Sequence, residues 1–137
     1  MTEFFADAES SFDNSKFVYY GYPYDGTACF RKGASLAPDE IRKHSYNFET
    51  YLLELGVDIT DVSMNDWGNI DVSPNQKKNE AAVEEIVSKI VNANKFPIGL
   101  GGEHSLTPPA VKALHAKYPT LSAVSYTHLR AHETIAD

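Results

Sequence analysis

The stretch Phe96-Pro97-Ile98-Gly99-Leu100-Gly101-Gly102-Glu103-His104-Ser105 decides the fold of this 137-residue chain. Its apolar first part, residues 96–100, predicts a short buried strand. The two glycines after it let the backbone leave a sheet through conformations that other residues resist. The run Thr107-Pro108-Pro109 then predicts the start of a helix that continues to about Lys117. The stretch therefore predicts a strand, a polar glycine turn and a helix in succession.

Strands and helices alternate along the rest of the chain. Residues 16–22 (KFVYYGY) are rich in Val, Phe and Tyr and predict a buried strand, as do residues 62–67 (VSMNDW). Residues 24–27 predict a turn in which Gly26 can take a positive φ. A further strand is expected to begin at residues 121–123.

Two more helices are predicted between these strands. The first begins at Pro38 and is expected to continue to about Leu53, before Gly56 ends it. The second is expected to be capped by Ser73, with Pro74 in its first turn. An apolar stripe at helical spacing supports the second helix: Val83, Ile86, Val87, Ile90 and Val91.

Helices that connect apolar strands imply a mostly parallel sheet covered on both faces. We therefore expect a three-layer α/β/α fold. Ligands in such folds bind beyond the carboxyl ends of the strands. Residues 101–105 lie at such an end.

Composition narrows the classes of partner. The 12 Lys and Arg against 19 Asp and Glu give a net charge of −7, which argues against a nucleic-acid partner. No apolar run of about 20 residues predicts a membrane span. Acidic residues near Met1 argue against a secretory signal, and the single Cys29 cannot form an internal disulfide. These features favour a cytoplasmic globular protein.

Residues 124–134 (VSYTHLRAHET) break the folding pattern and resemble one reading frame of a common transposase-type sequencing adapter. The same reading frame is also consistent with the codons of the residues on either side, Ala123 and Asp137. We therefore expect residues 124–137 to be an artefact that carries no function, although His128 and His132 imitate a metal site by their spacing. The native part is expected to be residues 1–123, the front of a longer protein.

The turn after residue 100 carries the chemistry that the sequence predicts. His104 projects from a strand end, where an imidazole can bind a metal ion, and Glu103 could anchor the loop or orient that imidazole. Gly101, Gly102 and Ser105 are expected to shape the loop. The alternatives are a purely structural histidine and an anion-binding loop. The anion-binding loop is disfavoured because the segment has no P-loop lysine and its prolines lack N–H donors.

The remaining candidates are expected to be structural. The sequence predicts exposed histidines on helices, a small packed cysteine, an ion pair near one turn and a core tryptophan: His44, His115, Cys29, Asp25 with Arg31, and Trp67.

Several blocks together with residues 96–105 resemble the ureohydrolase (arginase/agmatinase) family, over residues 12–123. The Tyr-Asp-Gly-Thr and Ser-Tyr-Asn-Phe-Glu-Thr strings are similar to its agmatinase branch. The blocks are Gly21-Tyr-Pro-Tyr-Asp-Gly-Thr27, Phe30-Arg-Lys-Gly33, Ala37-Pro38, Ile41-Arg42 and Ser45-Tyr-Asn-Phe-Glu-Thr-Tyr51.

This resemblance implies an arginase-like fold with two Mn²⁺ ions in each active site and His104 as the first histidine ligand. The family's Asp-Ala-His-x-Asp and Asp-x-Asp motifs, which supply the other ligands, are absent. The string Arg130-Ala-His-Glu133 lacks the leading Asp of the first motif. No Asp or Glu here is therefore assigned as a ligand and no residue as catalytic, and this chain is expected to be inactive on its own.

The resemblance implies that the full-length parent hydrolyses agmatine to putrescine and urea. Two metal ions that share one water lower its pKa and hold a hydroxide toward the guanidinium carbon. The alternatives are a guanidinobutyrase, an arginase, a formiminoglutamase, a non-catalytic binding protein of the same fold, or an anion- or nucleotide-binding module. Relatives imply a homo-oligomer, a trimer or a hexamer.

Overall fold

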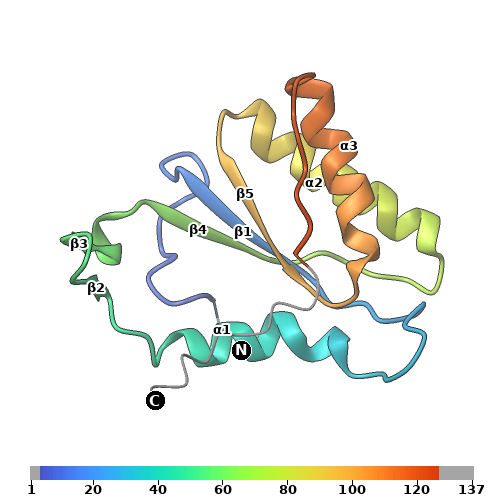
Figure 1. Cartoon of the computed structure of the whole chain (residues 1–137), viewed down its shortest axis with the longest axis horizontal. Helices are drawn as coiled ribbons and strands as arrows, with labels where there is room; N and C mark the ends of the chain where they lie inside the picture. Colours follow the sequence, from blue (N-terminus) through green and yellow to red (C-terminus); the bar gives the residue numbers. More distant parts are fainter. Residues whose placement is uncertain (1–3, 127–137) are drawn as a thin grey trace, which may run out of the picture.

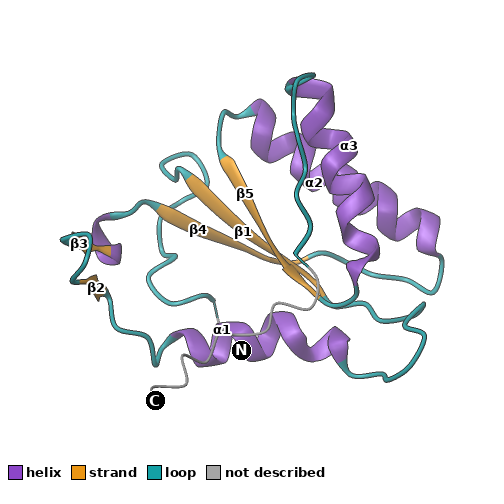
Figure 2. Cartoon of the chain, viewed as in Figure 1, coloured by secondary structure: helices purple, strands orange, loops and turns teal. Residues whose placement is uncertain are grey.

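The computed structural model describes residues 4–126. Its helices and strands alternate along the chain (Figure 2). The strands are β1 (Phe17–Tyr22), β2 (Tyr51–Leu52), β3 (Val57–Asp58), β4 (Met64–Asn69) and β5 (Phe96–Gly101). The helices are α1 (Ala37–Ser45), α2 (Gln76–Asn92) and α3 (Thr107–Lys117), with short 3-10 turns at Ala34–Leu36, Ile59–Asp61 and His104–Leu106.

The sheet is parallel, in the order β4-β1-β5, so the carboxyl ends of these three strands lie at one edge. Phe17 at the start of β1 is in register with Met64 on β4 and with Phe96 on β5. Helices α2 and α3 cover one face and α1 lies against the other (Figure 1). The expected parallel sheet and the three α/β/α layers are confirmed.

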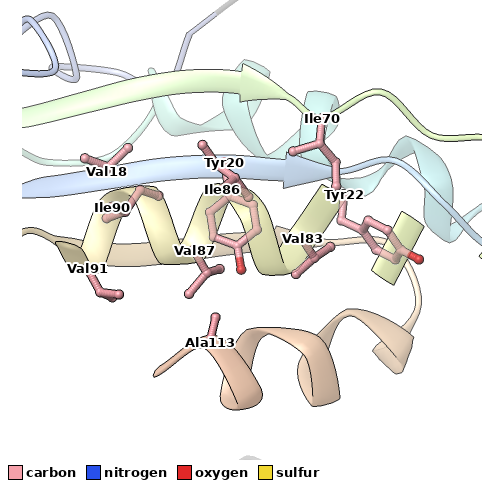
Figure 3. Close-up of a cluster of buried hydrophobic side chains, with 10 residues drawn as sticks. All are labelled: Val18, Tyr20, Tyr22, Ile70, Val83, Ile86, Val87, Ile90, Val91 and Ala113. Carbon is pink, nitrogen blue, oxygen red and sulfur yellow. The ribbon is translucent and has the colours of Figure 1, made fainter. Parts of the chain in front are cut away.

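The larger apolar core lies between the sheet and helices α2 and α3 (Figure 3). Alternate residues of β1 point to this face, because successive side chains of a strand point to opposite sides. The predicted apolar stripe of α2 packs against them and is buried along its whole length. The cluster consists of Val18, Tyr20, Tyr22, Ile70, Val83, Ile86, Val87, Ile90, Val91 and Ala113.

The opposite face is held differently. A smaller buried cluster contains Ala8, Tyr19, Met64 and Leu100. Beside it the fully buried Arg42 of α1 donates two hydrogen bonds to the carboxylate of Asp66, from Nε at 2.7 Å and Nη2 at 2.9 Å.

Further contacts extend this polar network, among them a hydrogen bond from the backbone N–H of Gly68 to Asp66 Oδ1 at 2.8 Å. Arg42 Nη1 donates to Asn69 Oδ1 at 2.6 Å, and the backbone N–H of Phe5 donates to Asp66 Oδ2 at 2.8 Å. The ion pair therefore joins α1, β4 and the N-terminal segment.

The first predicted helix is wrong in length, because α1 ends at Ser45 and not near Leu53. The Ser45 hydroxyl donates to the carbonyl of Arg42 at 2.6 Å and accepts the N–H of Ala6 at 2.8 Å. Residues 46–50 then form a turn and a bend, and residues 51–58 form the β2–β3 hairpin. Gly56, at φ 63°, belongs to the hairpin turn and does not end the helix.

The start of α2 also differs from the prediction. Asn75 is the cap, and its side chain accepts the N–H of Lys78 at 3.3 Å. Ser73 and Pro74 lie outside the helix. The reason is the buried Asn79, which exchanges two hydrogen bonds of 2.8 Å with the backbone of Ser73.

Three smaller predictions need correction. The strand predicted at residues 62–67 is present, but its ends are shifted: β4 begins at Met64 and continues through Gly68 to Asn69, and the φ of 88° at Gly68 accommodates a bulge opposite β1. Gly26 does not take a positive φ. Residues 121–123 form no strand, because no neighbouring backbone in the described part of the chain pairs with them.

None of the helices within residues 4–126 is long and apolar enough to cross a membrane.

Candidate functional site

The predicted glycine turn lies where β1 and β5 end together, at the carboxyl edge of the sheet. Two backbone hydrogen bonds join it to the residues that follow β1. The N–H of Gly102 donates to Tyr22 and the N–H of Glu103 donates to Tyr24, each at 2.8 Å. A Cβ on Gly102 would lie 2.2 Å from the carbonyl oxygen of Tyr24. Glycine is therefore required at position 102 by close backbone approach.

The carboxylate of Glu103 extends these contacts to Thr27. Its Oε2 accepts the backbone N–H of Thr27 at 2.9 Å, and its Oε1 accepts the Thr27 hydroxyl. Oε1 also accepts the Ser105 hydroxyl at 2.7 Å. Partial burial alone would raise the pKa of Glu103. The hydrogen bonds from Thr27 and Ser105 outweigh that effect and hold the pKa below its ordinary value.

His104 is exposed and is the first residue of the 3-10 turn that follows. Within residues 4–126, no hydrogen bond or ion pair involves its imidazole. Its ring nitrogens are therefore accessible as ligand atoms. The carboxylate of Glu103 is directed to Thr27 and Ser105 and forms no hydrogen bond to this imidazole in the described part of the chain.

A metal centre needs several ligands. No group of three His, Cys, Asp or Glu residues among the described residues lies close enough to hold a metal ion. The accessible imidazole of His104 is chemically able to act as one ligand, but the described residues do not form a complete donor set. The tail residues His128, His132, Glu133 and Asp137, which imitate a metal site in the sequence, lie outside the described residues.

The segment after Thr27 folds back on Asp25. The Asp25 carboxylate accepts the N–H of Gly33 at 2.6 Å, and Lys32 donates to the Asp25 carbonyl. The hydrogen bond from Gly33 lowers the pKa of Asp25. Arg31 lies over the Phe30 ring, 5.2 Å from its centroid. The predicted ion pair of Asp25 with Arg31 is therefore wrong, because backbone and lysine contacts hold Asp25 instead.

The other structural predictions have mixed outcomes. His44 and His115 are exposed on their helices, as predicted. Cys29 is exposed and not packed. Trp67 is 41% exposed, so its assignment to the core is wrong. Its ring lies under the Lys89 ammonium, 4.1 Å from the centroid, at the edge strand β4.

Sequence reasoning missed Thr27 as a contact of the predicted site. Thr27 and Glu103 are 76 positions apart, and no local pattern joins them. The one available signal was that parallel strands end at the same edge, which brings the residues after β1 next to those after β5.

The family of this chain follows from its sequence match. The arginase family sequence profile matches residues 15–136. The chain belongs to the arginase family. This agrees with the resemblance carried by the short sequence blocks.

Individual relatives are similar over most of the chain. The agmatinase of Bacillus cereus is 37% identical over 134 residues, which are 97% of this chain and 45% of that protein. The formimidoylglutamase of Halalkalibacterium halodurans is 31% identical over 80% of this chain and 35% of its own length. The chain thus spans less than half the length of these curated relatives.

Solved structures of the family have the same fold. The agmatine ureohydrolase of Thermoplasma volcanium superimposes with a TM-score of 0.79 at 37% identity, over 82% of this chain and 39% of that one. A Trypanosoma cruzi formiminoglutamase with Mn²⁺ has a TM-score of 0.72 at 26% identity, over 80% of this chain and 38% of that one.

Proposed function

We propose that the full-length parent of this chain is an agmatinase-type hydrolase that converts agmatine and water into putrescine and urea. The observation that supports this most is the placement of His104 in a tightly held turn at the carboxyl edge of an arginase-family sheet. The agmatinase relatives at up to 37% identity favour agmatine as the substrate.

The residues of this chain have separate tasks in the proposed site. His104 supplies one imidazole ligand. Gly102 lets the turn lie against the residues after β1, and Glu103 and Ser105 hold that turn by side-chain hydrogen bonds. Two Mn²⁺ ions, when bound, would supply the charge that activates water against the guanidinium carbon.

The test of the metal ligand uses the full-length protein with His104→Ala. An imidazole that binds the metal directly contributes to both affinity and rate, so Mn²⁺ binding and urea release should fall together. His115→Ala is the matched control, because His115 is exposed on α3. An unchanged Mn²⁺ affinity in His104→Ala would remove His104 from the metal site.

The 137-residue chain by itself is proposed to be inactive, because one histidine cannot hold two metal ions. A urea-release assay on this chain with added Mn²⁺ and agmatine tests that claim. Turnover at a rate comparable with that of the full-length protein would contradict it.

A second candidate substrate is formiminoglutamate, because formiminoglutamase relatives match both the sequence and the fold of this chain. Parallel assays of the full-length protein with agmatine, guanidinobutyrate, arginine and formiminoglutamate decide between them. The proposed function predicts the highest kcat/KM for agmatine. A preference for any other substrate would replace that assignment.

A further inference from the structure

We propose that residues 24–33 form one wall of the substrate site, and that Glu103 is the positioning residue that holds this wall against the metal-ligand turn. We call residues 24–33 the β1 wall. This inference rests on the proposed function, since it assigns a role to residues beside the same site.

Two residues of the β1 wall, Tyr24 and Thr27, form hydrogen bonds to Glu103 in the turn. The carbonyl of Tyr24 accepts the N–H of Glu103 at 2.8 Å. Three residues further on, Thr27 donates both its N–H and its hydroxyl to the Glu103 carboxylate. Glu103 therefore binds the wall both through its backbone N–H and through its side-chain carboxylate.

The second half of the β1 wall has its own internal contacts. The Asp25 carboxylate accepts the N–H of Gly33, and the Asp25 carbonyl accepts a hydrogen bond from the Lys32 ammonium. The segment is therefore closed by hydrogen bonds between its own residues. Its outer residues are nevertheless open to solvent, with Phe30 88% exposed. The wall thus has a defined shape but little apolar packing, and its position depends on Glu103.

The location gives this attachment a functional meaning. Ligands of parallel α/β sheets bind beyond the carboxyl ends of the strands, and the β1 wall follows β1 at that edge, beside the turn that carries His104. A carboxylate with charge-assisted hydrogen bonds to Thr27 fixes the separation between wall and turn. Such bonds are stronger than bonds between neutral groups, so they can hold an exposed segment.

The experiment compares Thr27→Val and Thr27→Ser in the full-length protein. Valine has the shape of threonine but lacks the hydroxyl, whereas serine keeps it. Thr27 is exposed, so neither change disturbs the core. Thr60→Val is the matched control, because the Thr60 hydroxyl donates to Asp58 at 2.7 Å in the same manner, beside the β2–β3 hairpin. Glu103→Gln is a second variant that weakens the bonds from Thr27 and also changes the bond from Ser105, so it is compared on KM and cleavage only.

Two readouts are measured. The first is KM against kcat for agmatine, together with Mn²⁺ affinity. The second is the rate of limited trypsin cleavage after Arg31 and Lys32, which reports the mobility of the β1 wall and requires no activity.

We expect Thr27→Val and Glu103→Gln to raise KM about tenfold, the effect of losing one hydrogen bond to a charged group. Trypsin cleavage within the wall should be faster in the same variants. In Thr27→Val the value of kcat and the Mn²⁺ affinity should stay within about twofold, since the backbone bond from Gly102 and the bond between Ser105 and Glu103 still hold the turn. Thr27→Ser and Thr60→Val should resemble the unmodified protein.

Three results would overturn the inference. Faster cleavage with an unchanged KM would make the attachment purely structural. A changed KM with unchanged cleavage would mean that the Thr27 hydroxyl contacts substrate directly. Unchanged values in both would remove Glu103 as a positioning residue. The absence of urea release from any guanidino substrate by the unmodified protein is a different result, which overturns the proposed function and the wall together.

Discussion

The two faces of the sheet are stabilised by different interactions. Against α2 and α3 the contacts are apolar and numerous, and the buried residues of α2 recur at helical spacing. Against α1 the apolar cluster is small, and a buried ion pair of Arg42 with Asp66 stands beside it. One face therefore depends on the summed burial of many side chains, whereas the other depends on a few partners that must all be present.

The largest expected effect is on the α1 face. Asp66→Ala leaves the charge of the buried Arg42 without its partner, and we expect a loss of about 3–5 kcal/mol in the free energy of unfolding. Urea denaturation of the full-length protein measures this loss. Asp39→Ala is the control, because Asp39 is 59% exposed at 3.5 Å from Arg42 and should contribute less than about 1 kcal/mol. Equal losses of unfolding free energy in the two variants would contradict the claim that the α1 face depends on the buried ion pair.

The next effect tests the apolar face. Ile90 of α2 is fully buried in the larger apolar cluster, and Ile90→Ala should cost about 3 kcal/mol through lost burial and a cavity. The half-buried Ile98 on β5 provides the comparison, and Ile98→Ala should cost about 1 kcal/mol in the same denaturation experiment. A larger loss at Ile98 would mean that the α1 face depends on apolar burial after all.

The third prediction concerns alkaline pH. Burial raises the pKa of Tyr20 to about 12, so the folded state favours its neutral form. The stabilisation is fully present below the unfolded pKa of 10 and is lost as pH rises toward 12. We expect a loss of about 2–3 kcal/mol over that range. Tyr20→Phe should remove this part of the pH dependence, which urea denaturation at several pH values measures. Parallel curves of unfolding free energy against pH for the two proteins would contradict the assignment of this pH dependence to Tyr20.

The smallest effect is expected outside both cores. Lys112 on α3 donates to Glu84 on α2 at 2.8 Å, and the two side chains are 71% and 37% exposed. Lys112→Ala should cost only about 0.5 kcal/mol, because exposed ion pairs are weak and are screened by salt. Denaturation at low and high salt measures this. A loss close to that of Ile90→Ala would show that the helix pair depends on charge.

The apolar face could be predicted from the sequence because its signals are local. The stripe of α2 depends on residues three and four positions apart, and β1 and β5 are short runs of apolar side chains. His104 was found for the same reason, since the turn that carries it is contiguous.

The α1 face could not be predicted because its partners are remote. The residues of β4 that accept hydrogen bonds from Arg42 lie 24 and 27 positions away in the sequence. The end of α1 depends on a bond from Ala6 to Ser45, and the attachment of the β1 wall depends on Thr27 and Glu103. A single sequence carries the residue types but does not indicate which pairs meet.

Gly102 constrains any attempt to redesign this protein. Since the backbone after β1 occupies the space of a side chain at position 102, the loops that follow β1 and β5 cannot be varied independently. A mutant library that randomises only the second loop would consist mainly of proteins in which the first is displaced. Engineering of specificity here should therefore diversify both loops together and keep this one glycine fixed.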